Sequence, residues 1–306
     1  MASLSDQAEQ LHKNLYGPKK DDDIVLDIAM NNNLKNRISI AQYYKSTFDK
    51  PVFEDIKSII GGDFGYCAAQ MFLSPLEFCI HHLKLGLSKS NDSACECVFE
   101  MLTSKTPEEL KIIENAYKKE TGKELKAEIT KKFPGAIGKN ILNLFDTQRK
   151  VNPSPRKNEC ENFANKLIKV DPKNWTEDEN LFKEIFIERS PEELILIARY
   201  YLKNTGKNLL DDIKKKVKGK SLILLKEILY NNIMPHELFA EKINSAIKGL
   251  GTNEEILSRA LVSRCELDMA AIREIYQYKY KVPMKDDIIG DTSDSYQKLC
   301  VYLGEK

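Results

Sequence analysis

The feature that most constrains this 306-residue chain is a pattern that occurs four times along it. Counted from one anchor position in each copy, an isoleucine follows after eight residues, a tyrosine after twelve and another isoleucine after twenty-four. The anchors are Asn32, Lys105, Arg189 and Arg264, and the shared tyrosines are Tyr44, Tyr117, Tyr201 and Tyr276. Stacked repeats bury the same face, so identical apolar positions are expected to form the core. We therefore predict four copies of one structural unit.

Each repeat is expected to consist of helices. Thr106-Pro107-Glu108-Glu109 has the residues of a helix start with a capping box, and Ser190-Pro191-Glu192-Glu193 repeats it in the next copy. Gly122 and Gly206 share a later position and are expected to end these helices. Asn-Gly and Asp-Gly hairpin signals do not occur. The sequence predicts an all-α chain whose repeats span residues 7–75, 79–146, 161–231 and 238–303.

The stretch between the second and third repeats, residues 147–160, breaks the periodic pattern. It contains Pro153 and Pro155 among several basic residues, and it accounts for most of the longer spacing between the second and third anchors. Proline-rich segments favour extended chain over helix. We expect an extended linker between two pairs of repeats.

Composition indicates a globular protein that meets other molecules through local surfaces. Charged residues make up 30% of the chain and the formal net charge is +1, so no global signal for nucleic-acid binding is present. The amino terminus lacks the apolar segment of a signal peptide, and no apolar run approaches the roughly 18 residues of a membrane span. A cytoplasmic protein that touches membranes only at their surface is expected.

The seven cysteines are expected to be free thiols. Cys95 and Cys97, downstream of two histidines, raise the alternative of a metal site. Their spacing matches no common zinc framework, and Cys97 occupies a register that is apolar in the other repeats. A place in the core is the favoured interpretation.

The fourth repeat contains a glycine-rich segment, Ile247-Lys248-Gly249-Leu250-Gly251-Thr252-Asn253-Glu254-Glu255. Glycine allows positive φ and places no side chain in the way, so successive carbonyl oxygens can point inward. Calcium takes six to eight oxygen ligands from carbonyls, carboxylates and water. A short loop of this kind supplies carbonyls but no charge. Asp291, which follows Thr252 by 39 residues, is a candidate for the carboxylate.

A Gly-x-Gly-Thr segment with an acid about 39 residues later resembles the type II calcium site of the annexins. The rest of the fourth repeat is also similar to that family, as in Ile272-Arg273-Glu274-x-Tyr276 and Asp291-Thr292-Ser293. The resemblance implies an array of four repeats, each of about five helices, that forms a curved disc. It implies Ca²⁺ as the cofactor and calcium-dependent binding to acidic phospholipid. The residues to which it assigns these roles are Ile247, Gly249, Gly251 and Asp291 for the ion, Thr252 and Glu254 for a secondary ion, and Leu250 for the membrane.

The first three repeats depart from this pattern at what we call the acid position, the place of Asp291. They carry Ile59, Lys132 and Lys216 there. One standard calcium site is therefore expected. The loss of the other three resembles the divergent alpha-giardins, annexins of a flagellated protist that are associated with the plasma membrane and the cytoskeleton.

Three further side chains are expected at the membrane, each with an open alternative. Lys132 and Lys216 place positive charge where calcium is lost and can attract anionic headgroups, or they are ordinary surface lysines. Trp175, the single tryptophan, has polar neighbours and suits an interface, or it packs locally. The acids Glu254 and Glu255 can equally complement a helix dipole.

These features predict a calcium-dependent, membrane-associated scaffold at the inner face of the plasma membrane, with cytoskeleton or flagella as further expected locations, and monomeric in solution. The alternative is a cytoskeletal adaptor whose assembly calcium tunes and whose lysines attract lipid without calcium. The four histidines fall in no catalytic motif and a phosphate-binding loop is missing, so no enzymatic activity is expected.

Overall fold

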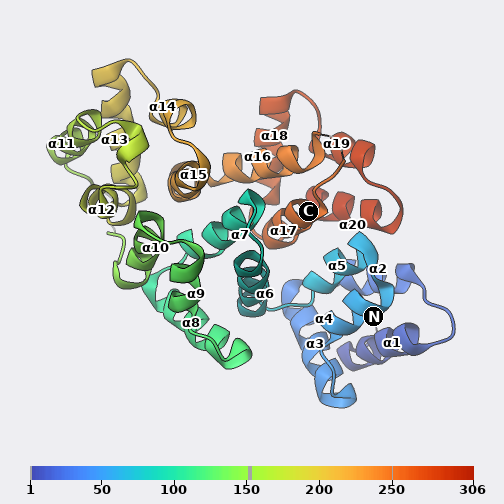
Figure 1. Cartoon of the computed structure of the whole chain (residues 1–306). Helices are drawn as coiled ribbons and strands as arrows, with labels where there is room; N and C mark the ends of the chain where they lie inside the picture. Colours follow the sequence, from blue (N-terminus) through green and yellow to red (C-terminus); the bar gives the residue numbers. More distant parts are fainter. Residues whose placement is uncertain (1, 151–153, 250) are drawn as a thin grey trace. The chain divides into compact units, whose positions relative to one another are not determined.

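The regular structure of this protein is helical. The computed structural model describes residues 2–150, 154–249 and 251–306. Over these ranges it contains twenty α-helices, two short π-helices and one 3-10 helix, and no strand (Figure 1). The predicted all-α class is confirmed. No helix in the described ranges is both long enough and apolar enough to cross a bilayer.

Each repeat is built from five helical segments. Repeat 1 contains α1 (Leu4–Tyr16), α2 (Asp22–Met30), α3 (Leu34–Phe48), α4 (Val52–Asp55) continued by the π-helix η1 (Ile56–Ile60), and α5 (Gly62–Gln70). Repeat 2 contains α6 (Pro75–Ser88), α7 (Asp92–Thr103), α8 (Pro107–Thr121), α9 (Leu125–Lys132) and α10 (Ala136–Asp146).

Repeats 3 and 4 have the same order of five segments, and repeat 3 has an additional 3-10 turn. Repeat 3 contains α11 (Lys157–Ile168), the 3-10 turn η2 (Pro172–Asn174), α12 (Glu179–Phe182) continued by the π-helix η3 (Lys183–Ile187), α13 (Pro191–Thr205), α14 (Leu209–Lys216) and α15 (Gly219–Ile233). Repeat 4 contains α16 (Pro235–Ile247), α17 (Glu254–Arg264), α18 (Met269–Tyr280), α19 (Met284–Asp291) and α20 (Asp294–Glu305).

Local sequence signals set the ends of the third helix in two repeats. The Thr106 side chain accepts from the Glu109 amide at 3.2 Å, and the Glu109 carboxylate accepts from the Thr106 amide at 2.8 Å. Ser190 and Glu193 form the same reciprocal cap at the start of α13. Gly122 and Gly206 end α8 and α13 with φ of 72° and 69°. Both predicted starts and both predicted ends are confirmed, because only glycine takes this left-handed conformation without strain.

The shared columns form the interior, as predicted. The four tyrosines and eight isoleucines that define the pattern are at most 4% exposed. Three of the tyrosines also hold a neighbouring helix, because each donates its hydroxyl to a carboxylate eleven residues later. The bonds join Tyr44 to Asp55 at 2.7 Å, Tyr201 to Asp212 at 2.6 Å and Tyr276 to Asp287 at 2.7 Å. This contact fixes the fourth helix of the repeat, which carries the acid position.

The chain divides into two compact units, and the pairing of repeats differs from the expectation. One unit joins the chain up to Phe78 with His236–Lys306, so repeat 1 packs with repeat 4; the other is Cys79–Pro235, which contains repeats 2 and 3. The stretch 147–160 therefore does not separate two pairs of repeats, and that expectation is wrong. Its residues Arg149 and Lys150 instead donate hydrogen bonds to backbone carbonyls at the α12–α13 junction.

Candidate functional site

The glycine-rich loop of repeat 4 connects the end of α16 to the start of α17. The Asn253 amide donates to the Ala246 carbonyl at 2.7 Å, which folds the loop back onto the end of α16. Gly251 has a φ of +85° and is exposed, as is Gly249, around which a Cβ would meet no atom. Carbonyls in the last turn of a helix have no partner within the helix. The loop and the end of α16 therefore present backbone oxygens at an open surface.

Asp291 reaches this loop from the end of α19. The Thr252 hydroxyl donates to the Asp291 carboxylate at 2.7 Å and to the Asp291 carbonyl at 2.8 Å. A second bridge of the same sequence separation joins Lys248 to Asp287 at 2.7 Å. The two bridges hold the carboxylate of Asp291 beside the glycine loop. The roles of the Thr252 hydroxyl and of Lys248 were not predicted from the sequence, although the shared separation of 39 residues was a usable signal.

The donor set suits a hard cation with oxygen ligands. Backbone carbonyls and one carboxylate are what Ca²⁺ prefers, and the exposed loop leaves coordination positions open to water or another oxygen. In the described ranges no three His, Cys, Asp or Glu side chains come together as a metal site, so any ion here depends on carbonyls. Leu250, the expected membrane contact of this loop, lies outside the described residues.

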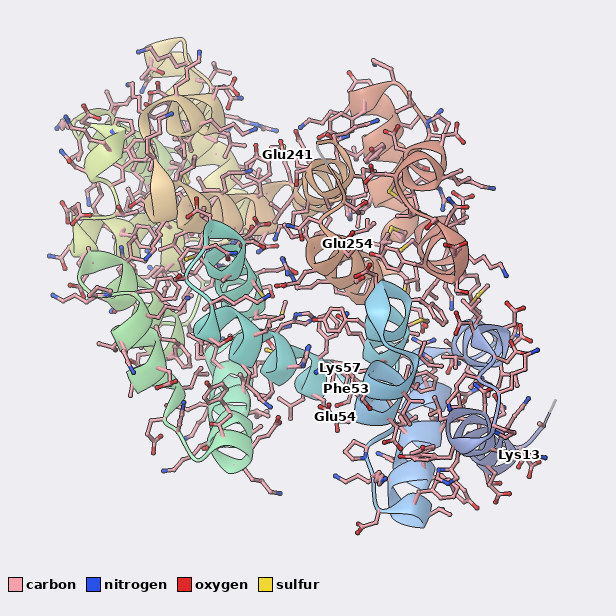
Figure 2. All side chains as sticks on the ribbon, turned by 45° about the vertical axis from the view of Figure 1, so that its right-hand side comes forward. Lys13, Phe53, Glu54, Lys57, Glu241 and Glu254 are labelled. Atoms are coloured by element: carbon pink, nitrogen blue, oxygen red, sulfur yellow. The ribbon has the colours of Figure 1, made fainter. Side chains whose placement is uncertain are left out.

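Glu254, labelled in Figure 2, is the first residue of α17 and follows the glycine loop in the sequence. Its backbone carbonyl accepts from the Tyr296 hydroxyl at 3.4 Å. An acid in the first turn of a helix also stabilises that helix through the dipole. The position is compatible with both roles considered for this side chain.

In repeat 2 the acid position holds a cation that contacts the corresponding loop. Lys132 is the last residue of α9, as Asp291 is the last residue of α19. Its Nζ donates to the backbone carbonyl of Lys89, in the loop between α6 and α7. Burial lowers the pKa of this half-buried ammonium. Repeat 2 thus places its own positive charge against a loop carbonyl, where repeat 4 offers a carboxylate.

In repeat 3 the indole of Trp175 is buried and donates to carbonyls around the start of its loop, so the expectation of an exposed indole is wrong. Trp175 is fully buried, and its Nε1 donates to the carbonyls of Leu167 at 3.3 Å and Val170 at 3.0 Å. Its ring meets Tyr201 edge-on, with centroids 6.0 Å apart. The polar residues beside Trp175 indicated an exposed loop, but the loop folds back over the end of α11 and buries the indole. The indole needs buried acceptors for its N–H, and the loop carbonyls supply them.

The remaining two acid positions do not contact their loops through a charge. Lys216 pairs with Asp212 on its own helix at 3.0 Å, so its ammonium is partly neutralised. Ile59 of repeat 1 lies in the π-helix η1 and offers no ligand. The structure therefore distinguishes Lys132 from Lys216, which sequence analysis treated alike.

Comparison with known proteins gives one family. The family model described as Annexin matches residues 88–144, 163–228 and 238–303, which is more than half of the chain. Annexin A6 of Mus musculus is 30% identical over 297 residues. The match covers 97% of this chain but 44% of annexin A6, so the chain spans less than half the length of that relative.

Solved structures have the same fold. Chicken annexin V superposes with a TM-score of 0.89 at 26% identity, covering the whole of this chain and 96% of the other. A calcium-bound alpha-1 giardin superposes with a TM-score of 0.76 at 20% identity, covering 99% of each chain. At that identity the likeness to the giardin concerns the fold alone. The predicted fold of four helical repeats is confirmed by these matches.

Proposed function

Because this chain belongs to the annexin family, we propose that it binds acidic phospholipid membranes in a calcium-dependent manner through a single standard site in repeat 4. The family is known for calcium-dependent phospholipid binding. The observation that carries the proposal for this chain is the bridge from Thr252 to Asp291, which holds the one carboxylate at an acid position beside an exposed glycine loop.

The carbonyls of Ile247, Gly249 and Gly251 and the carboxylate of Asp291 would hold the ion. Calcium would supply a positive charge whose remaining positions accept a phosphoryl oxygen of a lipid headgroup. The protein's part is to fix the carboxylate, through Thr252, and to keep the loop open. Neither the loop nor the headgroup completes the coordination shell alone, which makes binding depend on both.

A second component of membrane attraction rests on Lys132. Its ammonium is fixed at a loop carbonyl, and a basic residue near an anionic surface contributes about 1 kcal/mol. This attraction would not need calcium and would weaken with salt, since the charges of a membrane surface are screened over about 8 Å at physiological ionic strength. Lys216 contributes less in this scheme because Asp212 neutralises it.

We assign the chain a scaffolding role rather than an enzymatic one. Annexins are in general non-enzymatic binding proteins. A place at the inner face of the plasma membrane, with the cytoskeleton as partner and a monomer in solution, fits a protein that recruits other molecules to lipid. The adaptor function, with assembly tuned by calcium, remains the second candidate because three of the four acid positions lack a carboxylate.

Vesicle co-sedimentation tests the proposal. Vesicles of phosphatidylserine in phosphatidylcholine are mixed with the chain in calcium and in chelator, and pure phosphatidylcholine vesicles serve as the control. We expect strong binding to the acidic vesicles in calcium, a small salt-sensitive fraction in chelator, and none to the neutral control. Equal binding in calcium and in chelator would overturn the calcium-dependent function and leave the adaptor.

A further inference from the structure

A cleft of about 370 Å³ lies within the unit of repeats 2 and 3, and it belongs to none of the loops described above. Four segments line it: the α7–α8 junction, the stretch after α10, the α12–α13 junction and the end of α15. The size falls in the lower part of the range for small-molecule sites. The residues that line it are Thr103 to Pro107, Leu144, Thr147 to Lys150, Ile187, Pro191, Glu192, Asn231 and Asn232.

Positive charge dominates the lining. Lys105, Arg149 and Lys150 line the cleft together with a single acid, Glu192, and none of the three cations forms a salt bridge with a residue in the described ranges. The nearby carboxylates are committed elsewhere: Glu188 pairs with Arg189 at 3.0 Å, and Glu109 caps α8. The cleft therefore has more positive than negative side chains, and no carboxylate among the described residues neutralises the excess.

Arg149 is a desolvated cation of this lining. Its guanidinium donates to the carbonyls of Phe186 and Arg189, which uses two of its five N–H groups. Burial lowers its pKa to about 10, because the charge is desolvated without a carboxylate partner. Buried charges in proteins are ordinarily paired. An anion in the cleft would supply the missing partner.

One further observation points in the same direction. The Thr147 hydroxyl is buried and has no hydrogen-bond partner in the described part of the chain, and such orphaned groups call for a ligand or water.

We propose that this cleft is a binding site for a phosphate-bearing anion, held by Arg149, Lys105 and Lys150 with the Thr147 hydroxyl as a further donor. Guanidinium and ammonium groups with a hydroxyl match the several acceptor oxygens of a phosphate group. The anion is either a free phosphate compound or the phosphorylated headgroup of a lipid. The site is independent of the calcium loop and of the function proposed above.

Calorimetric titration of the full chain with inorganic pyrophosphate, in chelator, tests the first source. The double variant Lys105→Gln/Lys150→Gln should weaken binding at least about tenfold, since charge-assisted bonds are lost. The matched control is Lys111→Gln/Lys119→Gln, exposed lysines of α8 with the same charge change, which should bind as the wild type. Arg149 is left intact because it also holds two backbone carbonyls.

Two single variants keep the proposal falsifiable if the lysine variant folds poorly. Thr147→Val removes only the orphaned hydroxyl and should weaken pyrophosphate binding several-fold without lowering the melting temperature. Glu192→Gln removes the one acid and should tighten binding. Wild-type affinities in both variants would overturn the site.

The second source is tested with vesicles containing a phosphoinositide, again in chelator. Binding that pyrophosphate displaces, and that Lys105→Gln/Lys150→Gln weakens but the control does not, identifies a lipid headgroup; pyrophosphate binding without vesicle binding identifies a free phosphate compound. No dependence on the cleft lysines in either arm overturns the proposal. Asp291→Ala should leave both arms unchanged, which separates this site from the calcium loop.

Discussion

The loops of repeat 4 and repeat 2 are contacted from the same position of the repeat, but by side chains of opposite charge. In both, the fourth helix of the repeat ends at the acid position, and the side chain there contacts the loop between the first two helices. Repeat 4 places the carboxylate of Asp291 at the loop, whereas repeat 2 places the ammonium of Lys132. The comparison indicates that the loop between the first two helices has carbonyl oxygens that favour a positive partner. That partner is a bound ion where the acid position holds a carboxylate, and an ammonium group where it holds a lysine.

Repeat 3 shows a third arrangement. Its loop carbonyls are satisfied by the indole N–H of Trp175 and, at Thr176, by the Asn140 amide at 2.8 Å. The lysine at its acid position turns to a carboxylate on its own helix instead. A loop whose carbonyls are already hydrogen-bonded has less to offer a cation. The calcium function of the family is therefore expected to be concentrated in repeat 4.

The largest effect is expected for Asp291→Ala. The variant removes the one carboxylate of the site, and calcium affinity follows the number of charged ligands, so calcium-dependent vesicle binding should fall on the order of 100-fold. Asp286→Ala, an exposed acid on the same helix, is the matched control and should bind as the wild type. Retained calcium binding in Asp291→Ala, measured by calorimetry, would place the ion elsewhere.

Trp175→Ala sharpens the contrast with repeat 3. Removal of a fully buried indole should lower the free energy of unfolding by about 3–5 kcal/mol, as measured by urea denaturation. Vesicle binding by the folded fraction should not change. In the wild type, tryptophan emission should stay at short wavelength when calcium and acidic vesicles are added. A red shift of this emission, or lost vesicle binding by Trp175→Ala at unchanged stability, would indicate that the indole acts at the membrane surface.

Lys132→Gln and Lys216→Gln compare two equivalent positions with the same loss of charge. Lys132→Gln should weaken chelator-resistant binding to acidic vesicles about fivefold, corresponding to the roughly 1 kcal/mol of one basic residue. Lys216→Gln should have a smaller effect, because its partner Asp212 already neutralises the charge. Equal effects in co-sedimentation at low salt would mean that only net charge matters and that the contact with Lys89 has no role.

The sequence was sufficient for the architecture because its signals are repeated and local. Four copies of one column pattern specify a shared core, and a capping box such as that of Thr106 and Glu109 depends on residues three apart. The repeated features agree with the structure because each rests on backbone geometry or on burial that recurs in every repeat. The contact between Asp291 and the glycine loop is present as well, while the calcium site itself stays a prediction.

The errors concern the pairing of the repeats and single side chains whose partners are set by tertiary contacts. The neighbours of Trp175 are polar, yet the loop folds back and buries the indole. Lys132 and Lys216 each follow an acid by four residues. Glu128 pairs with Lys123 at 3.4 Å and not with Lys132, whereas Asp212 pairs with Lys216. That choice decides which lysine reaches a loop. The docking of Arg149 at the α12–α13 junction likewise depends on carbonyls far away in sequence.

The most direct test of the central claim is a crystal structure of the chain with calcium, in which anomalous difference density locates each ion. We expect an ion in the loop of repeat 4, with Asp291 and the loop carbonyls at roughly 2.3–2.6 Å, and none beside Lys132 or Trp175. An ion in the loop of repeat 2 or repeat 3, or an empty loop beside Asp291 at saturating calcium, would contradict it.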